Sequence, residues 1–231
     1  MRDYKLLIFD WDGTLVDSIG RIVMAMHQAA DQRGMPRRSD EAVKGIIGLA
    51  MPEAIRTLYP ELTTAEHVER FHASYSDCYL AIDRIPSAFF PGVEQSLASF
   101  LEQGYQLAVA TGKSRRGLQR ILDALGWQDY FDITRCADET ASKPDPKMLH
   151  EILEHCGVPA SQALMVGDAS FDLLMAQRAA MDSVAVGYGA QTLTALSAYG
   201  PKLSINHFME LSAWLNQTVA EPLTEEIEHV G

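Results

Sequence analysis

The amino-acid sequence predicts an α/β fold, in which a Rossmann-like parallel sheet carries helices on both faces and an α-helical domain is inserted after the first strand. Two observations predict it. Short apolar runs end in Gly, Thr or Asp and precede helical patterns, which indicates repeated strand–loop–helix units. In addition, about 100 residues separate Asp12 from Thr111, whereas a β-α-β unit needs only about 30. Extra structure must therefore lie between the first two strands.

The elements are expected in the following order. A buried strand covers residues 5–9, where an apolar run leads to Asp10. Apolar residues at helical spacing fill residues 18–82, and Pro and Gly in residues 86–92 indicate the return to the sheet. The later expected elements are helices at 93–102, 115–125 and 147–156, helices containing Leu196 and Leu211, and strands at 105–110, 163–166, 184–186 and 203–205.

This order divides the chain into two predicted domains. The core domain comprises residues 1–16 and 86–231, and the inserted helical domain comprises residues 17–85. The acidic tail at residues 221–231 is expected to fray.

Composition excludes several classes of function. The chain has 231 residues, with 19 Lys and Arg against 31 Asp and Glu, and its formal charge of −12 disfavours nucleic acid and anionic membranes as partners. No run approaches the about 18 apolar residues of a membrane span, and no signal peptide is expected. The three cysteines, Cys78, Cys136 and Cys156, lack metal-ligand spacing, as expected of free thiols in a cytoplasmic protein.

Two carboxylates follow the first strand directly. Asp10 and Asp12 stand two residues apart, so both side chains are expected on one side of the chain. Such a pair suits a division of labour between an ionised nucleophile or metal ligand and a proton donor with a raised pKa. A calcium loop of the EF-hand type is excluded, because its sixth and twelfth positions, counted from Asp10, hold Leu15 and Arg21 instead of Gly and Glu.

Three further motifs lie at expected strand ends or helix starts. The run Thr111-Gly112-Lys113 offers a hydroxyl and an unhindered amide near a helix N-terminus, which suits a phosphate group. Lys143 precedes a proline, which restricts its backbone to an extended geometry. Asp168 and Asp172 supply oxygen ligands of the kind that Mg²⁺ prefers, although an N-cap with a first-turn acid would give the same pattern.

Taken in order, these motifs resemble the four signatures of the haloacid dehalogenase superfamily of phosphohydrolases, and the chain looks most similar to its phosphoglycolate phosphatase-like members. The motifs are Asp10-Trp-Asp-Gly-Thr-Leu15, Thr111-Gly-Lys113, Lys143-Pro144 and Gly167-Asp-x-x-x-Asp172. Residues 17–85 look like the small α-helical cap of that superfamily, and we call them the cap. Two positions depart from the pattern: Ala169 stands where Ser or Thr is frequent, and Ala180 where Gly is frequent.

The resemblance implies a covalent route. Asp10 would attack the phosphoryl group to form an aspartyl-phosphate, and Asp12 would protonate the leaving alcohol and then activate water. Mg²⁺ would be held by the Asp10 and Asp168 carboxylates and the Asp12 main-chain carbonyl, with Asp172 supporting the metal site.

Lys143, Thr111 and Gly112 would balance or bind the transferring phosphoryl group, with Lys113 as a further candidate for substrate binding. In the cap, Gly48 lies in a loop that resembles the substrate-facing loop of the family. Three cap cations are candidates for a substrate carboxylate: Arg21, Lys44 and Arg56. The implied partner is a small phosphate ester such as 2-phosphoglycolate, bound by a monomer or homodimer.

Alternatives within the superfamily differ at known positions. Asp12 argues against a dehalogenase, which needs no acid for a halide, and against a phosphonoacetaldehyde hydrolase, which resembles this layout with Ala there. A β-phosphoglucomutase-like phosphoryl transfer uses the same two aspartates and stays open, because it differs mainly in cap contacts and water exclusion. A non-catalytic scaffold or regulator with this fold is the remaining alternative.

Overall fold

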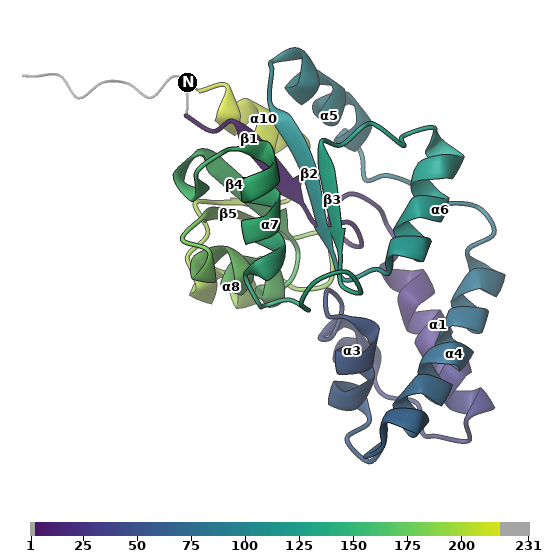
Figure 1. Ribbon diagram of the computed structural model, residues 1–231. Coiled ribbons are helices and arrows are strands. Elements are labelled where there is room, and N and C mark those ends of the chain that lie inside the picture. The colour runs from purple at the N-terminus through teal and green to yellow at the C-terminus, as the bar shows by residue number, and fades with distance from the viewer. Residues whose placement is uncertain (1–2, 218–231) are drawn as a thin grey trace, which may run out of the picture.

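A sheet of six parallel strands forms the centre of the computed structural model, which describes residues 3–217 (Figure 1). The strand order is β3-β2-β1-β4-β5-β6, with β1 (Leu6–Phe9) between β2 (Gln106–Thr111) and β4 (Ala163–Gly167). Every residue of β1 is buried, as expected of a strand covered on both faces. The remaining strands are β3 (Ile133–Cys136), β5 (Asp182–Val186) and β6 (Leu203–Ile205).

Helices cover both faces of the sheet. Leu7 and Phe9 of β1 point into one apolar cluster, and Leu6 and Ile8 point into another on the opposite face. The first cluster is covered by α5 (Val93–Glu102), α6 (Arg115–Leu125) and α10 (Met209–Leu215). The second is covered by α7 (Lys147–Cys156) and α8 (Ser170–Arg178), with α9 (Leu193–Leu196) beside α8. The predicted α/β fold class is confirmed.

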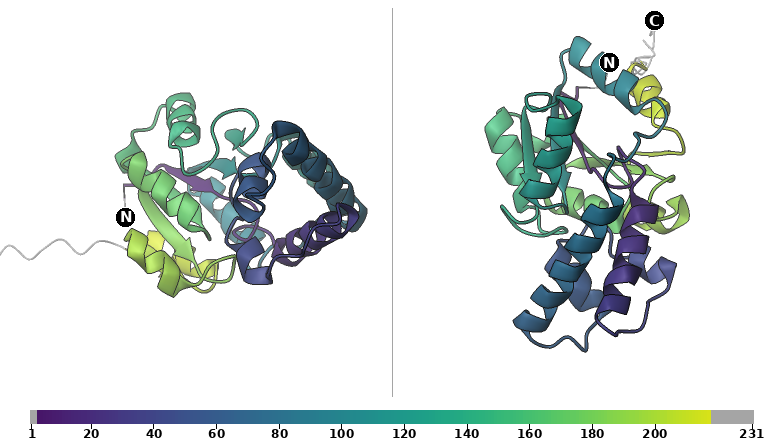
Figure 2. Two further views of the ribbon diagram at one scale, coloured as in Figure 1. Left: turned by 90° about the horizontal axis from the view of Figure 1, so that it is seen from below. Right: turned by 90° about the vertical axis from the view of Figure 1, so that its right-hand side faces the viewer.

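The cap consists of helices that lie beyond the carboxyl ends of the strands (Figures 1 and 2). They are α1 (Ile19–Gln32), α2 (Asp40–Lys44), α3 (Met51–Leu58) and α4 (Ala65–Ile82). Side chains before two of them accept amide protons, Ser39 for α2 and Thr64 for α4, which satisfies helix N-termini. Apolar residues of the cap form a cluster of their own, centred on the packing of α1 against α4.

Two connecting segments join the cap to the core side by side. The Asp17 amide donates to the Ala88 carbonyl at 2.9 Å, and the Phe90 amide donates to the Leu15 carbonyl at 3.0 Å. The chain therefore leaves the core and returns to it through a short antiparallel pairing of Val16 with Phe89.

The structure differs from the expected elements at one strand. Strand β3 is not among the predicted ones, because Thr134 and Arg135 are only partly buried and interrupt its apolar run. The three cysteines are unpaired, as expected. Within residues 3–217, no helix combines the length and apolarity that crossing a membrane would require. The predicted fraying of residues 221–231 lies outside the described residues.

The end of α8 has a left-handed residue that carries a side chain. Ala180 has a φ of 55°, where the resemblance led us to expect Gly. This conformation costs an L-residue about 1–2 kcal/mol, and Gly loses about 0.5–1 kcal/mol through its unfolded-state entropy. We therefore expect Ala180→Gly to raise the free energy of unfolding by about 0.5–1 kcal/mol in urea titrations. The control is Ala179→Gly, which should lower it, because Ala179 has a φ of −86°; equal effects of the two changes would contradict the explanation.

Candidate active site

The motifs meet where the strand order reverses. The chain runs from β1 to β2 on one side and later to β4 on the other, and ligands of open α/β sheets usually bind beyond the strand ends at such a point. Asp10 follows β1, Thr111 ends β2, and Asp168 follows β4. The structure therefore brings these three residues together, as the sequence predicts.

A buried cluster of carboxylates surrounds one ammonium group. Oxygens of Asp10, Asp168 and Asp172 lie within 4.8 Å of one another, and all three residues are buried. The Lys143 ammonium donates to Asp10 Oδ1 at 2.7 Å and to Asp172 Oδ1 at 2.6 Å, with only 1% of Lys143 exposed. Lys143 is thus tightly paired with the first and fourth motifs.

Hydrogen bonds orient two of these carboxylates. Thr14 Oγ1 donates to Asp168 Oδ1 at 2.9 Å, and the Ala190 amide donates to Asp168 Oδ2 at 2.6 Å. The Ala169 amide donates to Asp172 Oδ2 at 3.1 Å. By contrast, Asp10 Oδ2 is buried and has no hydrogen-bond partner among residues 3–217. A buried carboxylate oxygen left in this way indicates that a group is still to be bound there.

The electrostatics of the cluster point to missing positive charge. Burial raises the pKa of Asp10 well above its usual range, against the opposing effect of Lys143. Burial and the neighbouring Asp172 raise the pKa of Asp168 to about 7. Burial would lower the pKa of Lys143, but Asp10 and Asp172 hold it above its ordinary value, so this residue stays charged. One ammonium therefore faces three carboxylates.

The residues present fit a hard divalent cation. The available donors are carboxylate oxygens, the ligands that Mg²⁺ prefers, and one of them, Asp10 Oδ2, is unpaired among the described residues. The carboxylate of Asp12 is not part of this cluster. A contribution of Asp12 to the metal site stays a prediction and concerns its main-chain carbonyl.

We expect Mg²⁺ to stabilise the protein more at pH 8 than at pH 6. Because the folded-state pKa of Asp168 is raised to about 7, its proton stabilises the metal-free fold below the unfolded pKa of about 4, and this contribution is lost as the pH rises through 7. Metal binding needs the ionised carboxylates, so it gains as the proton leaves.

Mg²⁺ at 100 times its Kd should add about 2.7 kcal/mol, seen as a rise in Tm of about 5–10 °C. The measurement is thermal unfolding with Mg²⁺ and with a chelator at both pH values. Asp168→Asn serves as the control variant, and an undiminished Mg²⁺ response in it would contradict the site.

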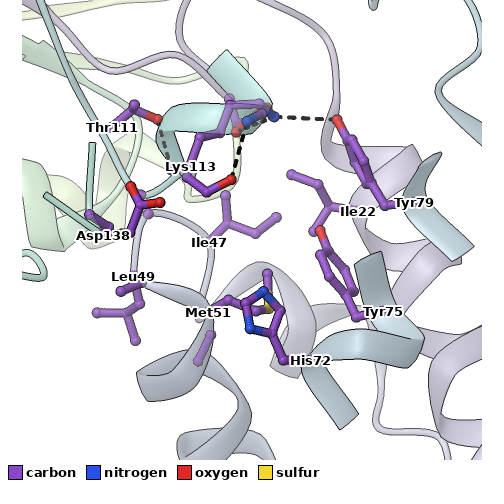
Figure 3. A pocket seen from close by; sticks show the side chains of 18 of the residues that line it. Ile22, Ile47, Leu49, Met51, His72, Tyr75, Tyr79, Thr111, Lys113 and Asp138 are labelled. Atoms are coloured by element: carbon purple, nitrogen blue, oxygen red, sulfur yellow. Dashed lines mark hydrogen bonds and ion pairs between the residues drawn. The ribbon is translucent and has the colours of Figure 1, made fainter. Parts of the chain in front are cut away.

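Asp12 lies in a different environment. Lys113 Nζ donates to both Asp12 carboxylate oxygens, at 2.8 and 2.9 Å, and Ser18 Oγ donates to Asp12 Oδ1 at 2.7 Å. The same ammonium lies 3.4 Å from the Tyr79 hydroxyl of the cap (Figure 3). Burial would lower the pKa of Lys113, but Asp12 raises it above its ordinary value, so the pair is ionic. The two motif aspartates are therefore paired with different lysines.

The cap loop at residues 48–50 lies in close contact with the second and third motifs. A Cβ atom on Gly112 would lie 2.6 Å from the Gly48 carbonyl oxygen and 2.7 Å from that of Leu49, closer than side chains allow. Gly48 itself has a φ of 101°. The Ala50 amide donates to Ser142 Oγ at 2.9 Å, beside Lys143. The absence of a side chain at Gly112 thus permits the close approach of the cap.

The model of the family described as haloacid dehalogenase-like hydrolase matches residues 7–186. The chain belongs to this family. This haloacid dehalogenase-like hydrolase is also similar, over most of its length, to curated proteins and solved structures.

A protein of Dickeya dadantii named "Probable phosphatase IndB" is 35% identical over 209 residues, which cover 89% of this chain and 91% of the relative. A phosphoglycolate phosphatase of Cupriavidus necator is 30% identical over 223 residues, with 94% and 95% covered. The crystal structure of a predicted phosphoglycolate phosphatase from Haemophilus somnus has a TM-score of 0.83 at 25% identity, with 93% of this chain and 99% of that chain covered.

The hydrolase places some sequence-predicted residues away from the site. None of the candidate cap cations, Arg21, Lys44 and Arg56, lines the cavity in front of the motifs. Arg21 instead pairs with the buried Asp83 at 2.6 Å.

Three contributors were missed in the sequence. Thr14 donates to Asp168, and Ser18 donates to Asp12. Their only sequence signal is position, since Thr14 lies inside the first motif and Ser18 shortly after it. Tyr79 lies within residues 18–82, where the sequence predicts only apolar helices, and no sequence pattern pairs it with Lys113.

Proposed function

We propose that this hydrolase is a Mg²⁺-dependent phosphatase that cleaves phosphate monoesters of small-molecule alcohols. The observation that carries the proposal is the different setting of two carboxylates at one end of one cavity. Asp10 lies in the buried cluster with Lys143, whereas Asp12 lies beside Ser18 and Lys113, towards the cap. The names of the relatives, phosphatase and phosphoglycolate phosphatase, support the same reaction class.

In the proposed first step, a carboxylate oxygen of Asp10 attacks phosphorus and the bond to the ester oxygen breaks. Asp12, in its protonated form, gives its proton to the leaving alcohol. Lys113 occupies both Asp12 oxygens here, so in this step it has to move from Asp12 to the substrate phosphate to leave an oxygen free to carry the proton. The products of this step are the alcohol and an aspartyl-phosphate.

In the second step, Asp12 takes a proton from water while the water oxygen attacks phosphorus, which releases phosphate and restores the Asp10 carboxylate. Lys143, the Thr111 hydroxyl and the Gly112 amide are suited to hold the phosphoryl oxygens in both steps. Asp10 and Asp168 would hold Mg²⁺, whose positive charge would offset the repulsion between phosphate and carboxylates.

We also propose residues 17–85 as the cap and residues 1–16 with 86–231 as the catalytic core. The pairing of the connecting segments and the separate apolar cluster of the cap support these boundaries. The cap encloses the cavity opposite Asp10 and Asp12, where it is placed to exclude water from the reaction.

Asp12→Ala tests the proton-transfer role. We expect phosphate release from an alkyl phosphate to fall by about 10²–10⁴-fold, because an alkoxide is a poor leaving group without a proton donor. Release from p-nitrophenyl phosphate should fall much less, because p-nitrophenolate leaves without protonation. Steady-state kinetics on both substrates checks this, and equal losses on the two would contradict the role of Asp12.

The function itself is tested by phosphate release from 2-phosphoglycolate, hexose phosphates and p-nitrophenyl phosphate, with Mg²⁺ and with a chelator. Release that needs metal supports the proposal. Transfer of phosphate between sugar positions without release would favour the mutase reaction instead, and inertness towards every ester would overturn the proposal.

A further inference from the structure

The cavity in front of Asp10 and Asp12 has two unlike walls. It has a volume of about 640 Å³ and lies between the core and the cap helices (Figure 3). The core contributes carboxylates, hydroxyls and cations at the reactive end. The cap contributes chiefly apolar and aromatic side chains, among them Ile22, Ile47, Leu49, Met51, Tyr75 and Tyr79. A leaving group bound opposite the phosphate would therefore contact an apolar surface.

The cap wall carries no positive charge at neutral pH. Among the described cap residues that line the cavity, none is a lysine or arginine. Burial lowers the pKa of His72, the histidine in this wall, so its imidazole is neutral at pH 7.5. Glu53 in the same wall is exposed and lies 3.9 Å from Arg56, which is outside the lining. A carboxylate on the leaving group would therefore find no ion-pair partner among the described cap residues that line the cavity.

All but one of the core cations at the cavity and the carboxylate cluster are already paired. Lys143 is paired with Asp10 and Asp172, and Lys113 is paired with Asp12. Arg120 is bound to the buried Asp83 at the C-terminal end of α4. Arg116 also lines the cavity and is exposed. A second anionic group that lies against the cap wall, out of reach of Arg116, would be desolvated against apolar side chains, which is strongly unfavourable.

We propose that the preferred substrate is a phosphate monoester of an uncharged, bulky alcohol with an apolar or aromatic body. This inference rests on the proposed function and names the substrate class of the same site. The volume agrees with it, since cavities of about 300–1,000 Å³ suit drug-sized ligands, whereas 2-phosphoglycolate would leave most of the space empty. Contact of such a body with the apolar wall stabilises the bound state, because apolar surface on both is removed from water.

The test measures binding with stable phosphonates as competitors of p-nitrophenyl phosphate hydrolysis. In the series from ethyl- to pentylphosphonate, Ki should fall about threefold to fourfold with each methylene. Butylphosphonate should bind at least about tenfold more tightly than 3-phosphonopropionate, which has a similar length but ends in a carboxylate. Titration calorimetry in Mg²⁺ gives the same ranking without turnover.

A positive charge placed in the cap wall tests whether this wall contacts the leaving group, and the same charge placed elsewhere on the cap is the control. Leu49 lines the cavity and is partly exposed, so Leu49→Lys can keep the fold while it adds a cation. We expect it to shift the ratio of the two Ki values by at least about tenfold towards 3-phosphonopropionate. Met24→Lys adds the same charge at a cap residue that is 51% exposed and outside the cavity lining, and it should leave the ratio unchanged.

The outcomes separate this inference from the proposed function. Metal-dependent hydrolysis with tighter binding of the longer neutral phosphonates supports both. Hydrolysis with equal or tighter binding of 3-phosphonopropionate leaves the phosphatase in place and overturns the substrate class. Equal shifts of the ratio in Leu49→Lys and Met24→Lys would also overturn it, because the cap wall would then not contact the leaving group.

Discussion

Asp10→Asn is expected to reduce phosphate release by at least about 10⁴-fold at saturating Mg²⁺. The amide has nearly the shape of the carboxylate but is not a nucleophile, and it offers a weaker ligand to a cation at the Oδ2 position. Lys143 would also lose the charged partner that it binds at 2.7 Å. The change therefore removes the attacking group while it leaves the packing at the end of β1 intact.

Stability separates this chemical effect from misfolding. Because burial raises the pKa of Asp10 well above its usual range, its ionised form destabilises the metal-free fold at neutral pH. We expect Asp10→Asn to unfold at the same or a higher urea concentration than the parent in the presence of a chelator. Asp129→Asn, at an exposed position away from the cavity, serves as the control and should keep full activity. Residual turnover above about 1% in Asp10→Asn would exclude Asp10 as the nucleophile.

Lys143→Met is expected to lower the free energy of unfolding by about 3–5 kcal/mol at pH 8 without metal, because it leaves two buried carboxylates uncompensated. The Lys143 side chain is fully buried, and its ammonium bridges Asp10 and Asp172. Methionine fills a similar volume without charge, so lost packing contributes little. Activity should fall by at least about 10²-fold, since the phosphoryl oxygens lose a fixed cation.

The pH dependence of this loss identifies its cause. Without the ammonium, the folded-state pKa of Asp10 rises further, so this residue can accept a proton at pH 5.5 and relieve the repulsion. Urea unfolding at pH 5.5 should therefore show a smaller loss than at pH 8. Lys147→Met is the control, because Lys147 is exposed and lies 3.9 Å from Glu151, and its effect should stay within about 0.5 kcal/mol. A loss independent of pH would indicate packing instead of charge.

The fold was predictable where burial is continuous along the chain. Strands β1 and β4 are buried and without a polar side chain at every position, and Asp follows each of them at once, so local pattern and environment agree. Strand β3 lies at the edge of the sheet, where one partner strand and half-exposed side chains suffice, and its sequence Ile-Thr-Arg-Cys carries no clear period. Its pairing with β2 depends on tertiary contacts that no local pattern encodes.

The positions of site residues at strand ends were predictable, but the partners of their side chains were not. Asp10, Thr111 and Asp168 follow from the rule that parallel strands end at one edge. The ion pair of Lys113 with Asp12 joins residues 101 positions apart, and nothing in the sequence distinguishes it from a solvated lysine. Arg21 shows the opposite case, since a plausible substrate ligand is bound by Asp83, whose burial the sequence does not reveal.

The pairing of Val16 with Phe89 also bears on how such a chain can change over evolution. Because the helical insert begins and ends at neighbouring points of the core, its excision would leave two ends that a short linker can join without disturbing β1 or β2. A foreign insert of any length whose own ends lie equally close could be grafted at the same place. Recombination at this junction can therefore replace the whole cap wall, which contacts the leaving group, in one event. The core residues that bind phosphate remain unchanged.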